Sequence, residues 1–377
     1  MTLRSWLEGR AELLPARIGA AHLSDAEREI AALRRPPTAR AFDEATAASL
    51  DVTRYRLHGR RLWRFPRVRP EHKAWLTEAE YGFERMTSRL LGLLPDGVEL
   101  PPFDFAVNLG DYPVRGAPIF TSWSPEGFGN VRMPNPLHWE RSVDVPLRDE
   151  RIRAHRHFDA DALARPWRER ANRVVWRGSA TGMYDSSFRF ARLRRLLRLR
   201  QGAGLARLEL CRLSARRPEL LDARITGWPQ LSERVRRLVE DEVPTGPKVD
   251  RSWYLAHRYI VNVDGNVGTA SFLSFLGAGT VVLKQESPYR DWCAEHLRAG
   301  EHSLAFAADL HDLPEVAAHA LEHPAVGARV EEAGRRFSAR FLTGTSVDFR
   351  LLALLDRYAG VAPVASEPGS DWILCRP

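Results

Sequence analysis

Asp111 is the first side chain whose type and position point to chemistry. It follows an apolar segment, residues 105–109, and is itself followed by Tyr112-Pro113. A carboxylate at the end of a strand beside a cleft can act as a general base. The alternative is an aspartate that only caps a helix or forms a turn, the commoner role of this residue. The local sequence leaves both interpretations open.

A second group has the composition of an anion site. Arg177-Gly178-Ser179 come at the end of an apolar segment that begins at residue 174. Glycine lets a ligand approach the backbone closely, and Ser179 can donate to a phosphate oxygen or cap the next helix. An ordinary strand-to-helix turn is the alternative. The basic run over residues 186–200 is expected to be mainly a solvated helix face.

Two more polar loops come at predicted strand ends. Asp264-Gly265 follow the apolar residues 259–263, and Lys284 and Glu286 follow residues 281–283. Asp264 could hold a ribose or sugar hydroxyl, or could make only an Asx turn. Glu286 could accept ribose hydroxyls, or form a salt bridge within its loop.

Aromatic residues gather in a loop rich in Pro, Gly and Trp, residues 121–150. Trp123, His138 and Trp139 could stack on sugar rings through their apolar faces. They could equally cover a core.

These residues need a scaffold, and the sequence predicts a parallel α/β sheet. Residues 253–313 read as strand, turn, small-residue helix and strand. Ligands of such sheets lie at the carboxyl ends of strands and at helix N-termini, where the polar loops fall. Upstream, residues 52–69 predict a hairpin that turns at His58-Gly59, and residues 71–94 an amphipathic helix. Pro166-Trp167 begin a new segment.

Many short motifs occur in a fixed order over residues 100–345. They are Asp111-Tyr112-Pro113, Trp176-Arg177-Gly178-Ser179, Leu221-Asp222-Ala223, Tyr259, Asn262, Asp264-Gly265, Thr269, Gly279-Thr280, Val282-Leu283-Lys284, Tyr289, Trp292, His302, Asp309-Leu310 and Asp312-Leu313. Each motif is weak alone, but their number, order and spacing are specific. The chain resembles glycosyltransferase family 90, in its bacterial form of the capsule-associated and protein O-glucosyltransferase type.

This resemblance implies a GT-B-like α/β fold, with two Rossmann-like domains facing a central cleft. We expect an N-terminal acceptor-side domain over residues 1–165, a nucleotide-sugar-binding domain over 166–345, and a C-terminal helix and tail over 346–377. The family implies inverting, metal-independent transfer of a glucose- or xylose-like sugar from a UDP-sugar to a hydroxyl of a glycan, peptide or small molecule. No cofactor is expected beyond the UDP-sugar as co-substrate. The single Asp-x-Asp match, Asp159-Ala160-Asp161, is expected to cap a helix.

The resemblance also assigns roles to residues. Asp111 is implied as the catalytic base. The expected donor-binding residues are Arg177, Gly178, Ser179, Arg189, Asn262, Asp264, Gly265, Ser271, Lys284 and Glu286. The expected acceptor-binding residues are Tyr112, Trp123, His138 and Trp139. Arg189 is chosen because the family has an arginine shortly after its Arg-Gly-Ser element.

One departure from the family concerns Ser271, which stands where the family has an arginine for the leaving diphosphate. Losing such a charge should cost several kcal/mol of transition-state stabilisation. Another arginine could replace it in space, or the start of the helix with Thr269 and Ser271 could suffice. The alternative function is therefore a non-catalytic relative that binds a nucleotide sugar or a glycan.

Composition sets outer bounds. A chain of 377 residues is expected to form two domains, and 44% hydrophobic with 28% charged residues is typical of a soluble enzyme. The net charge of +8 includes only three lysines, Lys73, Lys248 and Lys284. The excess of arginine over lysine is typical of a GC-rich coding bias, so nucleic acid is not expected as a partner. An anionic membrane surface could still attract exposed arginines.

The three cysteines are far apart and predict neither a disulfide framework nor a metal site. The first residues lack the apolar core of a signal peptide, and the longest nearly apolar run is too short for a membrane span. We therefore expect a cytoplasmic protein, with peripheral association at the inner face of the membrane as a further expectation.

Overall fold

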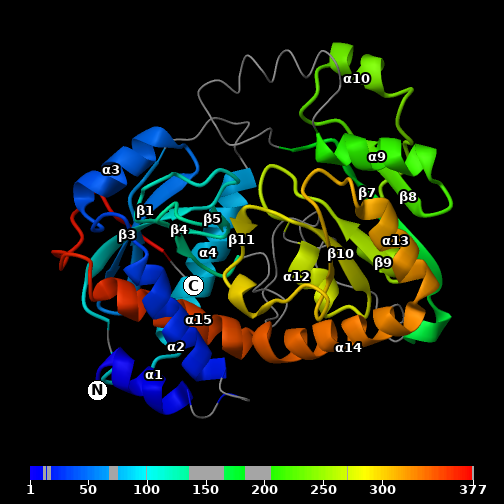
Figure 1. Ribbon diagram of the computed structural model, residues 1–377. Coiled ribbons are helices and arrows are strands. Elements are labelled where there is room, and N and C mark those ends of the chain that lie inside the picture. The colour runs from blue at the N-terminus through cyan, green and yellow to red at the C-terminus, as the bar shows by residue number, and fades with distance from the viewer. Residues whose placement is uncertain are drawn as a thin grey trace. The chain divides into compact units, whose positions relative to one another are not determined.

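The computed structural model describes residues 1–11, 14, 18–67, 75–98, 100–135, 165–182, 205–269 and 271–375. The chain forms two compact units. Unit 1 comprises residues 1–146, 288–294 and 340–377, and unit 2 comprises residues 147–287 and 295–339. Each unit combines helices with a β-sheet (Figure 1), so the α/β class is confirmed. The boundary expected after residue 165 and the tail expected from residue 346 stay predictions.

Unit 2 contains a five-stranded sheet in the order β12-β10-β9-β7-β8, and every neighbouring pair is parallel. Its strands are β7 (Ala171–Ser179), β8 (Leu221–Gly227), β9 (His257–Asn262), β10 (Val281–Gln285) and β12 (Leu304–Phe306). Its helices are η4 (Trp167–Glu169), α9 (Ala206–Arg216), α10 (Glu233–Val239), α11 (Arg251–Tyr254), α12 (Ser271–Leu276), α13 (Leu313–Glu322) and α14 (Pro324–Phe341), which enters unit 1 at its last residues; η5 (Ala294–His296) lies at a junction of the units. The parallel sheet predicted over residues 253–313 is confirmed.

The strands of unit 2 are apolar because the sheet is covered on both faces. Figure 1 shows α9 beside β7 and β8, and α13 packs against β7 and β12. The core includes Trp176, Val261 and Leu283, each at most 5% exposed. Tyr259 is fully buried and donates its hydroxyl hydrogen to the Ala320 carbonyl at 2.5 Å. This bond ties β9 to α13 and satisfies the one polar atom that the ring brings into the core.

The main sheet of unit 1 is mixed, with six strands in the order β13-β2-β1-β3-β4-β6. Its strands are β1 (Val52–His58), β2 (Arg61–Arg64), β3 (Phe103–Asn108), β4 (Phe120–Thr121), β6 (Val131–Arg132) and β13 (Ile373–Leu374); β5 (Ser124–Pro125) and β11 (Tyr289–Arg290) form a separate pair. β3, β4 and β6 are parallel, whereas β13, β2, β1 and β3 pair antiparallel.

The antiparallel part begins with the predicted hairpin, which is confirmed. Gly59 and Arg60 connect β1 to β2 with φ values of 56° and 60°. A two-residue connection of this kind reverses the chain with the twist that antiparallel strands need. It explains why unit 1 is not parallel throughout, as unit 2 is.

The helices of unit 1 pack around an aromatic core. They are α1 (Leu3–Ala11), α2 (Ile18–Ala31), α3 (Ala39–Ala48), α4 (Trp75–Gly92) and α15 (Gly344–Ala359). Figure 1 shows α15 in red against α2 in blue, from opposite ends of the chain. The rings of Tyr55, Phe105 and Phe120 stack edge to face or face to face between the sheet and the helices. Within the described residues, no helix is both long and apolar enough to cross a bilayer.

Candidate active site

The strand order of unit 2 creates a switch point between β7 and β9. From β7 the chain continues to β8 on one side, and then to β9, β10 and β12 on the other. Loops after the two strands therefore diverge, which leaves room for a ligand at their carboxyl ends. The residues predicted for donor binding come from these ends: Ser179 closes β7, Asn262 closes β9 and Lys284 lies near the end of β10.

The Arg-Gly-Ser element occupies the carboxyl end of β7. Gly178 cannot be replaced easily, since a Cβ there would lie 2.5 Å from the ring of Trp176. The pairing of β7 with β8 shifts between Gly178 and Ser179, which turns the backbone out of the ladder. The glycine thus serves close packing, and the shift exposes the carbonyl of Ser179 to the residues of the next helix.

Arg207 joins the loops on both sides of the switch point. From the first turn of α9, its guanidinium donates to the Ser179 carbonyl at 3.2 Å and to Thr181 Oγ1 at 2.5 Å. It also donates to the carbonyls of Asp264 at 3.2 Å and Val263 at 3.4 Å. The side chain is only partly buried. A positive charge is therefore held at the place where parallel α/β sheets bind anions.

The sequence interpretation missed Arg207. It searched for a diphosphate arginine in the basic run after Ser179 and chose Arg189, which lies outside the described residues. The available signal was position: Arg207 begins an amphipathic helix whose neighbours Leu205 and Leu208 are buried. An arginine between two core residues faces the protein, whereas those of a continuous basic run mostly face solvent.

Arg177 lies on the opposite face of β7 from Trp176. Its guanidinium donates to the Asp222 carbonyl at 2.7 Å and to Asp222 Oδ2 at 3.0 Å, and it lies 4.6 Å from the ring of Trp253. Burial alone would raise the pKa of Asp222, but hydrogen bonds from Arg177 and Arg224 outweigh it and lower that pKa. Arg177 therefore ties β7 to β8.

Asp264 forms hydrogen bonds through both carboxylate oxygens and through its backbone N–H. Its Oδ1 accepts from Lys284 Nζ at 2.9 Å and its Oδ2 from the Ser287 hydroxyl, while its backbone N–H donates to Gln285 Oε1 at 2.9 Å. Lys284 thus neutralises Asp264. Glu286 is exposed, and the residue turned inward at the end of β10 is Gln285.

Ser271 begins α12 and accepts a hydrogen bond from Asn262 Nδ2 at 3.2 Å. Asn262 Oδ1 is buried and has no hydrogen-bond partner within the part of the chain that the structure describes. One turn along the helix, Ser274 Oγ accepts from Arg251 at 3.1 Å. Burial lowers the pKa of Arg251 to about 10, so it stays protonated at neutral pH. An arginine therefore lies beside the helix that begins at Ser271.

In unit 1, Asp111 follows β3 in a loop that Asn108 closes. Asn108 is 1% exposed; its Nδ2 donates to the Tyr112 carbonyl at 2.7 Å, and its Oδ1 accepts from the Gly110 N–H at 3.0 Å. Gly110 packs so tightly on Asp51 that a Cβ would lie 2.0 Å from the Asp51 carboxylate. Asp111 is thus carried by a loop with a fixed backbone, and Asn108 is a second residue that the sequence interpretation did not single out.

Trp123 is at the same edge of the unit 1 sheet as Asp111. β3 and β4 are parallel neighbours with Asn108 opposite Thr121, so Asp111 and Trp123 each follow within three residues of that pair. Both are partly exposed. His138 and Trp139 lie outside the described residues, as does Asp159-Ala160-Asp161.

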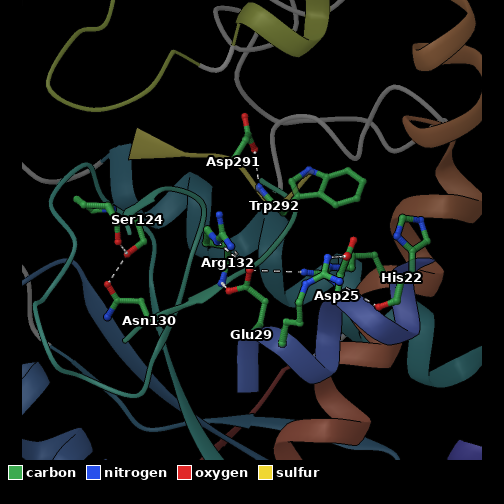
Figure 2. A network of polar contacts seen from close by, with 11 residues as sticks. His22, Asp25, Glu29, Ser124, Asn130, Arg132, Asp291 and Trp292 are labelled. Carbon is green, nitrogen blue, oxygen red and sulfur yellow. Dashed lines mark hydrogen bonds and ion pairs between the residues drawn. The ribbon is translucent and has the colours of Figure 1, made fainter. Parts of the chain in front are cut away.

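A polar network fixes β6 against α2 and α15 (Figure 2). Glu29 accepts from the backbone N–H and from Nε of Arg132, at 2.9 and 2.8 Å. Arg350 is fully buried, 3.9 Å from Asp25 and 4.0 Å from Glu29, and donates to the His22 carbonyl at 3.2 Å. These bonds join three segments that are distant in sequence next to the parallel strands that precede the Asp111 and Trp123 loops.

Comparison with known proteins identifies the domain. Residues 198–368 match the family model described as Glycosyl transferase family 90. The region from residue 198 to residue 368 is therefore similar to glycosyltransferase family 90. The resemblance stated from the motifs is confirmed, and the family 90 region includes Arg207, Asp264 and Ser271.

Relatives of this chain include two named proteins. It is 25% identical over 292 residues to protein O-glucosyltransferase 2 of Danio rerio, covering 74% of this chain and 51% of that protein. It is 24% identical over 286 residues to protein O-glucosyltransferase 3 of Homo sapiens, covering 74% and 50%. The chain spans about half the length of the curated relatives it matches. The solved structure of TarM is 11% identical, with a TM-score of 0.37, covering 60% of this chain and 39% of that chain.

Proposed function

We propose that the chain is an inverting glycosyltransferase that moves a glucose- or xylose-like sugar from a UDP-sugar to a hydroxyl of a glycan, a peptide or a small molecule. The observation that carries the proposal is Arg207, which joins the loops after β7 and β9 at the switch point inside the family 90 domain. The names of the relatives, both protein O-glucosyltransferases, support the activity class.

In this proposal Asp111 is the general base. It takes the proton of the acceptor hydroxyl while the hydroxyl oxygen attacks the anomeric carbon of the donor. The bond from that carbon to the diphosphate oxygen breaks, and UDP leaves on the opposite face, so the configuration inverts. General bases contribute roughly 10²–10⁴-fold to such steps. The loop that Asn108 closes gives Asp111 a fixed backbone, which limits the reorganisation needed to reach the proton.

The leaving diphosphate needs positive charge. Arg207 is our first candidate, because its guanidinium is fixed by four acceptors and still partly exposed. Arg177 and Arg189 remain candidates from the sequence, and Gly178, Ser179 and Gly265 would line the same ends of the strands. Tyr112, Trp123, His138 and Trp139 are proposed on the acceptor side.

We propose that transfer needs no metal ion and no cofactor besides the UDP-sugar. The positive charge of Arg207 at the strand ends supports this proposal. Transfer should persist in excess chelator. Complete loss that Mg²⁺ or Mn²⁺ restores would contradict it.

The alternative is a non-catalytic relative that binds a nucleotide sugar or a glycan. Ser271 in place of the family arginine favours it. Ser271→Arg distinguishes the two cases: with an open site, the variant should bind UDP more tightly. Activity in the wild type would remove the alternative.

The deciding experiment is a panel of sugar nucleotides. A ligand at a hundred times its dissociation constant should stabilise the fold by about 2.7 kcal/mol, easily seen as a rise in melting temperature. Hydrolysis or transfer from the bound donor is then measured with chromatography. Stabilisation by UDP-glucose or UDP-xylose with release of UDP is expected, whereas no response to any sugar nucleotide would overturn the proposal.

We also propose a cytoplasmic location, with weak association at an anionic membrane surface. Exposed arginines such as Arg234 and Arg237 on α10 would be attracted to acidic lipids. Sedimentation with acidic vesicles should fall steeply with salt. Equal sedimentation with neutral vesicles would contradict the electrostatic attraction.

A further inference from the structure

A continuous chain of polar contacts crosses the carboxyl edge of the unit 2 sheet. Gln285 Nε2 donates to the Ala308 carbonyl at 2.6 Å, and Gln285 Oε1 accepts from the Asp264 N–H at 2.9 Å. The Asp264 carbonyl in turn accepts from Arg207 at 3.2 Å, and Arg207 reaches Thr181 at 2.5 Å. The chain therefore runs from the segment after β12, through β10 and β9, to the loop after β7.

Gln285 is the buried member of this chain, being 6% exposed. Its amide nitrogen donates to the Ala308 carbonyl, and its amide oxygen accepts from the Asp264 N–H. A buried amide with both ends satisfied holds its neighbours in fixed positions, because breaking either bond leaves a buried polar group without a partner. Gln285 thus fixes the backbone of the Asp264 loop against the end of β12.

The position of that backbone decides where Arg207 points. Two of the acceptors of Arg207 are the carbonyls of Val263 and Asp264, which belong to the loop that Gln285 holds. Lys284 and Ser287 bind the carboxylate of Asp264, so they hold its side chain and not its backbone. Gln285 alone of these three residues binds the Asp264 backbone directly.

We propose that Gln285 is a positioning residue of the donor site: by holding the backbone of Asp264, it aims Arg207 at the diphosphate of the bound nucleotide. The inference rests on the proposed function and deepens it. Gln285 itself touches neither the donor nor the acceptor in this proposal. Its loss should therefore change recognition of the diphosphate more than recognition of the nucleoside.

The test is Gln285→Leu, which keeps the approximate volume and removes both hydrogen bonds. UDP affinity should fall about tenfold, in the range of one or two lost hydrogen bonds, while uridine affinity changes less than about twofold. Both are measured by isothermal titration calorimetry on the full chain, with the melting temperature of each free protein recorded.

The matched control is Thr280→Val, at the residue that precedes β10. Thr280 is 2% exposed, and its Oγ1 has no hydrogen-bond partner among the described residues, so this variant changes a buried polar side chain next to β10 but away from the site. It should bind UDP and uridine like the wild type.

Three results separate the outcomes. A selective loss of UDP affinity in Gln285→Leu supports the positioning role. An equal loss of UDP and uridine affinity, or unchanged UDP affinity in a folded variant, overturns it. If Gln285→Leu does not fold, Gln285→Met is measured by the same criteria. Failure of the wild type to bind any nucleoside diphosphate would instead overturn the proposed function itself.

Discussion

The two units of the chain bury polar residues in different ways. Unit 1 buries ion pairs between distant segments, such as Glu29 with Arg132 and Arg350 near Asp25. In unit 2, Asn262 and Gln285 are buried at the carboxyl ends of parallel strands, and the charged Arg207 there is only partly buried.

The difference shows that burial of polar groups has two purposes here. In unit 1 the charges hold chain segments together, since one partner without the other would be a desolvated charge. In unit 2 the polar groups set the positions of loops at a switch point, where a ligand can use them. Substitutions in unit 1 should therefore affect stability first, and substitutions in unit 2 should affect binding first.

The largest effect is expected for Glu29→Ala. It leaves Arg132 and Arg350 without the carboxylate between them, and removing one partner of a buried pair costs about 3–5 kcal/mol. Urea unfolding followed by circular dichroism measures the loss. The control is Glu332→Ala on α14, where Glu332 pairs with Arg335 and Arg336 in solvent, so its loss should leave the stability nearly unchanged. Equal losses in the two variants would contradict a structural role of the network.

The second prediction concerns Asp111, the proposed base. It lies in unit 1, but its substitution should lower the rate of transfer and not the stability. Asp111→Asn is isosteric and should leave folding and UDP affinity unchanged. Transfer should fall by roughly two or more orders of magnitude. Initial rates with saturating donor are compared with those of the wild type. Near-normal transfer would remove Asp111 from its proposed role.

The third prediction sharpens the comparison inside unit 2. Arg207→Ala should weaken UDP binding by roughly 1.5–3 kcal/mol and uridine binding far less, because a charge-assisted contact to the diphosphate is lost. Arg177→Ala removes the pair with Asp222 and should lower stability while changing UDP affinity less. Calorimetric titration of both variants decides between them. A larger loss of UDP affinity in Arg177→Ala would reverse the assignment in favour of the residue chosen from the sequence.

The smallest effect is pH-dependent and belongs to unit 1. Burial raises the pKa of Glu84 to about 7, and the neighbouring Glu80 adds to this while Arg64 opposes it. In the unfolded chain the carboxyl loses its proton near its ordinary pKa, so the folded state loses stability as pH rises from about 4.5 to about 7. Glu84→Gln should remove this loss and gain on the order of 1–2 kcal/mol at pH 8, and nothing below pH 4.

Thermal unfolding of wild type and Glu84→Gln between pH 4 and pH 8 tests this. Glu44→Gln is the surface control, since Glu44 is exposed and paired with Arg35 and Arg40. A difference between wild type and Glu84→Gln that does not grow with pH would contradict the sign.

Local sequence determined the elements that position the site. The hairpin at His58-Gly59, the strand that ends in Arg177-Gly178-Ser179, and the strand and turn before Asp264 were all predictable. Each depends on neighbouring residues: on alternation of apolar side chains, on glycine in a turn, or on a polar residue directly after a buried strand. The motif order likewise identified the family, which the match over residues 198–368 confirms.

Only the tertiary structure decided which side chains meet. Arg207 binds the carbonyl of Asp264, 57 residues away, and Arg350 binds that of His22, 328 residues away. The local sequence places Arg207 next to the buried Leu208 at the start of α9, but it does not name the carbonyls that Arg207 binds. Its position follows from the strand order, which brings the ends of β7 and β9 together at the start of α9. The sequence thus determined the type of each helix, strand and turn, because the interactions that form them are local. The site required the sheet topology, because its residues become neighbours only when the sheet forms.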